Sequence, residues 1–344
     1  MRAYLGPLLS TLCFLALPLA AGAQDNRFNG RITFQGAKMS GVDLATDGKY
    51  FVFGFSTGYL SIFAPDPKKY TPIEVFPAHT KAISAVLFSP DNKWVATASL
   101  DGNVKLWETY VIVQFQEESL KGKKSIFPQE KKKFAALSGA IKSLSYSPDG
   151  TSLATAGTDG TIKVWSTDTA KLSYSIAAHK AGVNAGAYSP DGKWIASAGT
   201  DKTAKIWKAS AGKTPDFTLE GHDGPVLALA YSPDGKHLAT GSGVAKKSGQ
   251  LFVWDAETGK QEYKLGELED VVTTLDFHPK LPRLASGGRD KKIRVWNTET
   301  KKQIYMDEHV EALIKLTFTL DGKWLGSICP DEAKIWIGSP KVSE

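Results

Sequence analysis

The stretch "AYSPDGKWIASAGTDKTAKIW", residues 187–207, decides the fold because altered copies of it recur along the chain. Its alternating polar and apolar residues indicate half-buried β-strands rather than helices. The "SPDG" segment supplies a tight turn, since proline fixes φ, aspartate bonds its own backbone and glycine accepts a positive φ. The stretch therefore reads as strand, turn, strand, turn and a third strand that ends at Trp207.

Seven copies follow one another at a spacing of about 40 residues, which is typical of propeller repeats. The residues equivalent to His179 are Gln35, His79, Leu137, His222, Leu268 and His309. The aromatic residues that close the seven copies are Phe63, Trp107, Trp165, Trp207, Trp254, Trp296 and Trp336. A four-stranded sheet of this size cannot bury both faces alone, so successive copies must pack together. The sequence predicts an all-β, seven-bladed β-propeller with four antiparallel strands per blade.

The two ends of the chain are expected to close the ring. After Trp336 the chain continues only with "IGSPKVSE", which is too short and polar to form an outer strand. The segment "NGRITFQ", residues 29–35, aligns with the outer strand that precedes His179. We therefore expect the N-terminal segment to supply the outer strand of the last blade.

The repeat resembles the WD-repeat family over nearly all of the chain after residue 23. Gly221-His222 and Trp254-Asp255 match the family's two dipeptides outright. The resemblance implies a buried hydrogen-bonded set of His, Ser or Thr, Asp and Trp in each blade. The matching residues are His79, Thr97, Asp101 and Trp107; Thr155, Asp159 and Trp165; His179, Ser197, Asp201 and Trp207; His222, Thr240 and Trp254; Ser286, Asp290 and Trp296; and His309, Ser327 and Trp336. Because the sets repeat blade after blade, we interpret them as structural and expect no catalytic residue.

The first copy departs from this pattern. Gln35, Phe53, Thr57 and Phe63 fill its four positions. In other copies Leu137 and Leu268 replace His, and the aspartate of the copy that begins at His222 is lost in an insertion.

Residues 1–23 are typical of an export signal. They contain Arg2, an apolar run from Leu5 to Leu19 and a small-residue cleavage site at Ala21-Gly22-Ala23,. An uncleaved anchor is the alternative. We expect an exported, bacterial protein, periplasmic rather than secreted, whose residues 24–344 form one propeller. Cys329 would then be the only cysteine, so burial and hydrogen bonds must stabilise the fold.

Composition argues against several classes of function. The net charge of +6 would suggest nucleic acid in a cytoplasmic protein, but export makes that partner unexpected,. No pair among the six histidines and two cysteines has metal-ligand spacing,. No glycine-rich phosphate loop or nucleophile elbow is present. The sequence therefore predicts no cofactor and no enzymatic activity.

Two departures from the repeat are candidate binding elements. An insertion at about residues 109–130 mixes lysines with apolar residues and is expected to be a docking loop for an acidic protein or an anionic membrane surface, with a solvated hairpin as the alternative,. A second insertion, residues 242–250, lengthens a turn on the top face. The candidate partner-binding residues are Lys81, Leu100, Lys121, Lys123, Lys124, Phe127, Lys246, Lys247, Asp270, Arg289 and Glu311.

The leading hypothesis is a non-enzymatic protein-interaction scaffold in a periplasmic or envelope-associated complex, a step that rests on analogy. A ligand-binding or enzymatic site in the central channel is a second hypothesis. The inner strands "ISAVLF", "VNAGAY" and "VLALAY" are mainly small and apolar, which argues against it. A third is an envelope-biogenesis role like that of Tol-system propellers, which share the "SPDG" turns but lack the closing Trp.

Overall fold

The structure is a computed structural model that describes residues 30–33, 38–46, 49–63, 75–120, 127–135, 139–319, 321–322 and 324–337. The expected export signal lies outside these residues. So do Gln35, Leu137, Lys121, Lys123 and Lys124.

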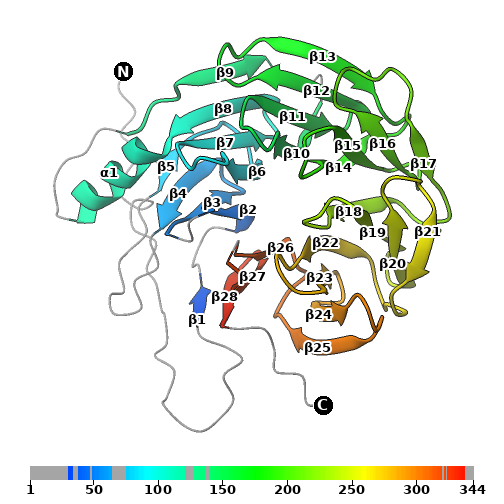
Figure 1. The fold of residues 1–344 in the computed structure, drawn as a ribbon. Coiled ribbons are helices and arrows are strands. Elements are labelled where there is room, and N and C mark those ends of the chain that lie inside the picture. The colour runs from blue at the N-terminus through cyan, green and yellow to red at the C-terminus, as the bar shows by residue number, and fades with distance from the viewer. Residues whose placement is uncertain are drawn as a thin grey trace, which may run out of the picture.

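Seven four-stranded antiparallel sheets are arranged in a ring (Figure 1), which confirms the predicted propeller. The inner strands are β2 (Met39–Leu44), β6 (Ile83–Phe88), β10 (Ile141–Tyr146), β14 (Val183–Tyr188), β18 (Val226–Tyr231), β22 (Val272–Phe277) and β26 (Lys315–Phe318). The second strands are β3 (Phe51–Phe55), β7 (Trp94–Ser99), β11 (Ser152–Gly157), β15 (Trp194–Gly199), β19 (His237–Val244), β23 (Arg283–Gly288) and β27 (Trp324–Cys329). Blades are numbered 1 to 7 in this order.

The outer half of each blade completes the sheet. The third strands are β4 (Tyr59–Phe63), β8 (Asn103–Glu108), β12 (Thr161–Ser166), β16 (Ala204–Lys208), β20 (Ser248–Asp255), β24 (Lys292–Asn297) and β28 (Glu332–Ile337). The outer strands of blades 1 to 6 are β5 (Phe76–Pro77), β9 (Lys132–Ala135), β13 (Leu172–Ala177), β17 (Phe217–Leu219), β21 (Gln261–Lys264) and β25 (Gln303–Glu308).

The ring closes through the N-terminal segment. Strand β1 (Gly30–Thr33) pairs antiparallel with β28, in a register that runs from Gly30 opposite Ile335 to Thr33 opposite Glu332. Blade 7 therefore has the order β1-β28-β27-β26 and draws strands from both ends of the chain (Figure 1). This confirms the predicted closure.

The apolar core lies between neighbouring blades. Ile162 and Val164 of blade 3, for example, pack in one buried cluster with Val183, Ile195 and Trp207 of blade 4. The second strands are buried almost throughout, since each is covered by a blade on either side. Burial between blades explains why one repeat cannot be stable alone.

The "SPDG" turns have the conformation that their composition predicts. In the turn of blade 4, Ser189 Oγ donates to Asp191 Oδ1 at 2.6 Å and the Lys193 amide donates to the same oxygen at 3.0 Å. Gly192 has a φ of 74°, which glycine adopts at little cost,. These turns connect inner to second strands, and we call the end of the ring that carries them the bottom face.

The insertion after β8 begins with a helix, so the predicted loop conformation and its hairpin alternative are both wrong for residues 109–120, while the docking role of the insertion stays a prediction. Helix α1 (Thr109–Leu120) lies against blade 1 (Figure 1), where Ile112 and Phe115 are buried beside Phe76. Outer strand β5 pairs with β4 only at two positions, Tyr59 with Pro77 and Leu60 with Phe76. Gln116 Nε2 of α1 donates to Ser61 Oγ of β4 at 3.0 Å. The helix thus covers a part of β4 that β5 does not reach.

Replacing Phe115 with alanine is expected to destabilise the protein by about 3 kcal/mol, because it empties a buried aromatic site between α1 and Phe76,. Urea unfolding measures the change. Tyr110→Ala in the same helix is the matched control, since Tyr110 is 67% exposed and its loss should cost less than about 0.5 kcal/mol,. Equal losses for the two variants would show that α1 does not stabilise blade 1.

The second insertion extends two strands rather than the turn alone. Strands β19 and β20 remain paired through Ser242 with Gln250 and Val244 with Ser248. The expected longer turn of residues 242–250 is therefore reduced to Ala245, Lys246 and Lys247, with Lys246 at a φ of 58°. The turn stands at the end of the ring that carries the turns between second and third strands, which we call the top face.

Candidate functional site

The buried polar set of blade 4 is continuous. Trp207 Nε1 donates to Ser197 Oγ at 2.9 Å, and Ser197 Oγ lies 2.8 Å from His179 Nε2. The other nitrogen of the same imidazole, His179 Nδ1, lies 2.9 Å from Asp201 Oδ1. Strands β15 and β16 position the serine and tryptophan, while the loop before β14 carries the histidine. The set joins three segments of the blade near the top face.

One protonation pattern satisfies every member of this set. The Ser197 hydroxyl accepts from Trp207, so it can donate to a neutral His179 Nε2, and the Nδ1–H then donates to Asp201. Burial lowers the pKa of His179, and the Asp201 carboxylate opposes that effect. Burial also opposes the ionisation of Asp201, but hydrogen bonds from Thr203 and the His179 ring outweigh it and hold its pKa below the usual range.

Blade 2 repeats the arrangement. Trp107 Nε1 donates to Thr97 Oγ1 at 2.9 Å, Thr97 Oγ1 lies 2.8 Å from His79 Nε2, and His79 Nδ1 lies 3.0 Å from Asp101 Oδ2. Burial raises the pKa of Asp101, but amide hydrogen bonds from Asn103 and Thr80 and the His79 ring together lower it to about 2.

The partial sets keep the contacts that their residues allow. Trp165 Nε1 donates to Thr155 Oγ1 at 3.0 Å in blade 3, where Asp159 accepts from the Thr161 amide at 2.9 Å. In blade 7, His309 Nε2 lies 2.7 Å from Ser327 Oγ, and Trp336 lies on β28 opposite Leu325.

Blade 5 replaces the lost aspartate with residues that sequence reasoning missed. His222 Nε2 lies 2.7 Å from Thr240 Oγ1, to which Trp254 Nε1 also donates at 2.7 Å. In place of an aspartate, Ser242 Oγ lies 2.6 Å from His222 Nδ1. The Phe252 ring stacks on the imidazole with centroids 4.4 Å apart. Burial without a direct carboxylate partner lowers the pKa of His222 to about 4, so this histidine is neutral near pH 7.

In blade 6 an arginine pairs with the aspartate in place of the missing histidine. Leu268 is buried where the histidine stands in other blades, so Asp290 has no imidazole to bind. Arg294 NH1 lies 2.7 Å from Asp290 Oδ2 instead, and both side chains are nearly inaccessible. Trp296 Nε1 still donates to Ser286 Oγ at 2.9 Å. The position of Arg294 two residues before Trp296 was the available sequence signal.

These Ser, His and Asp residues do not form a nucleophilic site. Ser197 is 0% exposed, and its hydroxyl already bonds both the Trp207 and the His179 rings. A nucleophile needs access to its substrate and a base free to accept its proton. The geometry instead performs a structural task, which is to satisfy buried polar groups inside each blade.

The candidate top-face residues lie on loops at one end of the ring. In blade 2 the Thr80 amide donates to Asp101 at 3.1 Å, so the loop before the inner strand β6 meets the turn after the second strand β7. Lys81, Lys246, Lys247 and Arg289 are exposed, and Leu100 is 41% exposed. The Lys246 amide donates to Asp270 Oδ1 at 3.0 Å. Glu311 Oε1 lies 3.9 Å from Lys38 Nζ.

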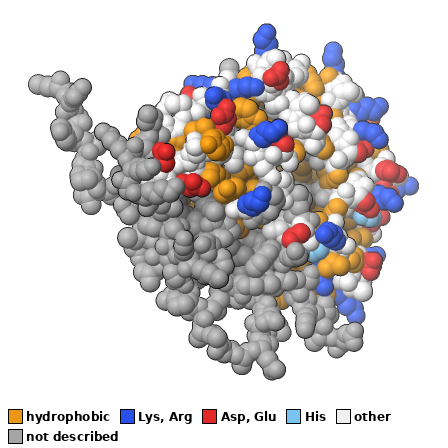
Figure 2. Space-filling model, turned by 60° about the vertical axis from the view of Figure 1, so that its left-hand side comes forward, with side chains coloured by type: hydrophobic (Ala, Val, Ile, Leu, Met, Phe, Trp, Pro, Cys, Tyr) orange, Lys and Arg blue, Asp and Glu red, His pale blue; other side chains and the backbone are white. Residues whose placement is uncertain are grey.

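Phe127 is the one candidate residue of the first insertion that the structure describes. It is 51% exposed, and its ring lies 5.6 Å from that of Phe115 on α1. Figure 2 shows lysine, arginine and acidic side chains mixed with apolar ones over the described part of one side of the molecule. The charges on that side alternate in sign rather than forming a uniform basic field.

The inner strands also carry charged residues that sequence reasoning missed. Asp43, Ser145 and Asp276 hold one equivalent ring position, since each pairs with the same place on its second strand. Asp43 Oδ2 accepts from the Phe88 amide at 2.8 Å, and Asp276 Oδ2 accepts from the Phe318 amide at 2.7 Å. A carboxylate inside the apolar strands "MSGVDL" and "VTTLDF" was the signal that could have found them.

Neither a metal centre nor a membrane span emerges from the parts of the chain that the structure describes. Within them, no three His, Cys, Asp or Glu side chains group as metal ligands would. No helix among them is long and apolar enough to cross a bilayer.

Fold and buried polar sets together define a WD-repeat propeller. The family model described as "WD domain, G-beta repeat" matches residues 70–108, 130–166, 170–208, 213–255 and 259–297, which is more than half of the chain. The protein therefore belongs to the WD40 repeat family. Proteins of this family generally act as protein-interaction scaffolds.

Relatives share the repeat over different lengths. Periodic tryptophan protein 2 homolog of Dictyostelium discoideum is 25% identical over 322 residues, covering 88% of this chain and 32% of that protein. WD repeat-containing protein 3 of Mus musculus is 30% identical over 132 residues, covering 38% of this chain and 13% of that protein. Cilia- and flagella-associated protein 52 of Homo sapiens is 26% identical over 140 residues, covering 41% and 20%. The chain thus spans about a third or less of the length of these relatives.

Proposed function

We propose that this protein is a rigid, non-enzymatic scaffold that binds other proteins through loops of its top face. The main support is that the buried polar residues are bonded to one another inside the blades, while other side chains are exposed on the top-face loops. The His, Ser, Thr and Asp sets are engaged inside the blades, whereas Lys81, Leu100, Lys246 and Arg289 are exposed on loops at one end of the ring. Exposed side chains on loops of a rigid frame make a recognition surface.

The proposed setting is an exported, bacterial protein that belongs to a periplasmic or envelope-associated complex. The support is the N-terminal sequence alone, with Arg2, the apolar run from Leu5 to Leu19 and the small residues before Gln24,. The named relatives are eukaryotic and carry no argument for this setting. An acidic protein or an anionic membrane surface, bound through the lysines of residues 121–133, is the proposed partner of the bottom face,.

Affinity purification from the native host after mild cross-linking tests the scaffold. We expect a stoichiometric protein partner whose recovery falls at least about tenfold in the Lys246→Glu/Lys247→Glu variant, as for the loss of more than one charged contact. Lys213→Glu/Lys260→Glu is the matched control, since it makes the same charge change at exposed lysines of the connections between third and outer strands. Equal loss in both variants would contradict binding at the top face.

Deletion of residues 122–130 tests the bottom face in the same experiment. If this deletion releases the partner and the Lys246→Glu/Lys247→Glu variant does not, the bottom face is the binding surface. Recovery of no partner above background would contradict the scaffold and favour a small ligand in the channel. Sedimentation with vesicles that contain anionic lipid, compared with neutral vesicles, separates membrane binding from protein binding.

A further inference from the structure

The outer edges of the blades differ in how well they are protected against pairing with another chain. An outer strand leaves half of its backbone N–H and C=O groups unpaired, and a strand of another molecule can bind them. Most of the outer strands are short: β5 has two residues, β17 has three, and β1, β9 and β21 have four each. The sequences KKFA of β9 and QEYK of β21 also contain charged residues, which keep other strands away,.

Among the described outer strands, two are six residues long and one of these is uncharged. Strand β25 of blade 6 has the sequence QIYMDE and ends in two acidic residues. Strand β13 of blade 3 has the sequence LSYSIA, which contains neither a charged residue nor a proline. Figure 1 shows β13 along the outer rim of the ring. Folded proteins protect long edges with charges, prolines or short strands, and β13 has none of these.

The hydrogen-bond pattern shows which backbone groups of β13 face outward. Directly after β13, the Ala178 amide donates to Gly160 O at 2.9 Å. Bonded and non-bonded pairs alternate along an antiparallel ladder, so Ile176 is in a bonded pair with β12, whereas Ser175 and Ala177 are not,. Both of these residues are exposed. Their N–H and C=O groups point away from β12 and are open to another strand.

A second copy of the same edge is the partner that these groups fit. Two copies of residues 173–177 can pair antiparallel about a two-fold axis at Ser175, so that Ser175 of each copy exchanges both backbone hydrogen bonds with Ser175 of the other. Ala177 then lies opposite Ser173 of the second copy. No charged side chains meet in this register. Two copies of β25 would instead bring together four carboxylates, two from each strand, and like charges destabilise a strand pair,.

We propose that the protein forms a two-fold dimer in which β13 pairs antiparallel with β13 of a second copy. The pairing uses the free edges of both strands, so the assembly closes at two copies. The contact is one strand wide in each copy, which is small for a stable interface. We therefore expect the dimer to form at high protein concentration and to dissociate on dilution.

The proposed pairing fixes the orientation of the two top faces. Strand β13 runs from the bottom face, where residues 167–171 connect it to β12, to the top face, where residues 178–182 lead to β14. Antiparallel pairing reverses this direction in the second copy, so the two top faces point to opposite sides of the dimer. If the top face binds a protein, a step that rests on the proposed function, the dimer holds two partners on opposite sides.

Sedimentation velocity of the natural chain over a range of concentrations tests the dimer. We expect the weight-average mass to rise from that of one copy towards that of two copies, and to go no higher. A chain that stays monomeric up to near-millimolar concentration would overturn the proposal. This readout needs no top-face partner, so its failure is distinct from failure of the scaffold.

Two substitutions of Ser175 test the site of pairing. Ser175→Pro removes an outward amide that β12 does not use, and we expect the dissociation constant of the dimer to rise at least about tenfold, since two hydrogen bonds are lost at the axis. Ser175→Lys places two ammonium groups across the axis and should raise it about fivefold. Met306→Lys is the matched control, because Met306 pairs with Arg294 on β24 as Ser175 pairs with Lys163 on β12. An equal effect of both lysine variants would contradict pairing at β13.

Ser175→Cys locates the two-fold axis and does not depend on the stability of the other variants. The Cα atoms of a bonded antiparallel pair are about 5.5 Å apart, which a disulfide can bridge. The natural cysteine that the structure describes, Cys329, is buried. We expect mild oxidation to give a covalent dimer of Ser175→Cys at concentrations where Met306→Cys stays monomeric. Equal cross-linking of the two variants, or none in a chain that dimerises, would show that β13 is not the contact.

Urea unfolding at a concentration where the natural chain is monomeric checks the fold of each variant. The unfolding midpoint of Ser175→Lys should match that of the natural chain, because the side chain of Ser175 is exposed and its backbone groups face outward,. A dimer that weakens only in proportion to a lowered midpoint would show that the substitution acts on the blade and would contradict the proposed contact.

Discussion

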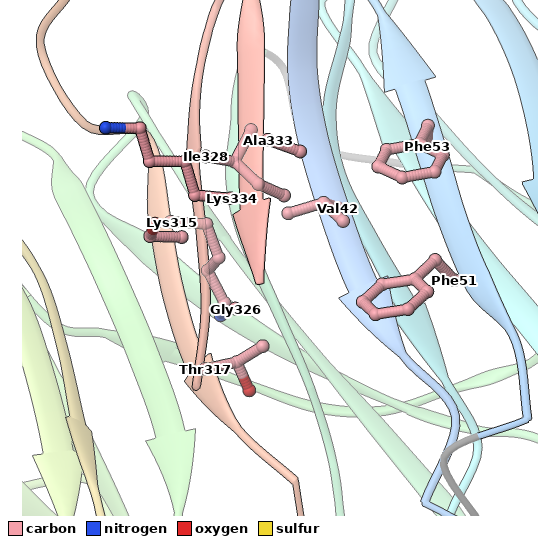
Figure 3. A pocket seen from close by; sticks show the side chains of 10 residues that line it. Val42, Phe51, Phe53, Lys315, Thr317, Gly326, Ile328, Ala333 and Lys334 are labelled. Carbon is pink, nitrogen blue, oxygen red and sulfur yellow. The ribbon is translucent and has the colours of Figure 1, made fainter. Parts of the chain in front are cut away.

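Removal of residues 24–34 will cost the protein at least about 4 kcal/mol of its free energy of unfolding, while removal of residues 339–344 will cost almost nothing. The first deletion takes away β1 and leaves β28 as an exposed edge. Four residue pairs of the β1–β28 ladder are lost, at about 1 kcal/mol for each net hydrogen bond,. The deletion also opens the ring in blade 7, next to a pocket that lies between blades 7 and 1 (Figure 3). A loss of this size is a large part of the stability of a typical domain.

Ile32→Pro tests the same closure without shortening the chain. Proline lacks the amide hydrogen and interrupts a strand ladder, and Ile32 pairs with Ala333 near the middle of β1,. Urea unfolding of the two deletions and the proline variant should place Ile32→Pro close to the loss of residues 24–34. If both deletions cost the same, the N-terminal strand does not close the ring.

The parts of the fold that could be predicted from the sequence are those that local chemistry determines. Each "SPDG" turn carries its own proline, aspartate and glycine, and Gly192 adopts the positive φ that the turn demands,. The polar sets could be located because their members stand at fixed intervals in each copy. The alignment of residues 29–35 with other outer strands was enough to predict the closure, because the repeat fixes what each blade must contain.

Helix α1 could not be predicted because tertiary contacts overrule its local preference. Residues 111–113 are Val, Ile and Val, which favour strands in isolation,. The helix forms where β5 leaves part of β4 uncovered, and Ile112 and Phe115 fill that site. The uncovered part of β4 belongs to blade 1, whereas the helix that covers it belongs to the insertion in blade 2.

Tertiary structure also determines the role of single residues that the sequence did not reveal, in blade 5 and on two inner strands. Ser242 replaces an aspartate beside His222 because the extended strands place it there, and only the paired register reveals that extension. Asp43 and Asp276 are more than two hundred residues apart in the sequence, and only the closed ring places their strands β2 and β22 on either side of blade 7. Neither relation is visible within one repeat.

Replacing Asp201 with alanine is expected to destabilise the fold by about 2–4 kcal/mol, because partners of a charged acceptor in a largely buried set are left without it. The His179 Nδ1–H and the Thr203 hydroxyl and amide all lose this acceptor. The effect should pass to the other members of the set, since His179 then no longer presents a fixed Nε2 to Ser197. Thermal and urea unfolding measure the loss.

The pH dependence of this variant distinguishes a lost charge from a lost shape. The pKa of Asp201 is lower in the folded protein than in the unfolded chain, so its contribution is present above about pH 4 and disappears as the pH falls,. The difference in the free energy of unfolding between the natural protein and Asp201→Ala should therefore become smaller towards pH 3. Asp168→Ala is the control, since that side chain is 96% exposed and its removal should cost less than about 0.5 kcal/mol at any pH,. A melting temperature of Asp201→Ala unchanged within error would show that the repeated polar sets do not hold the blades together.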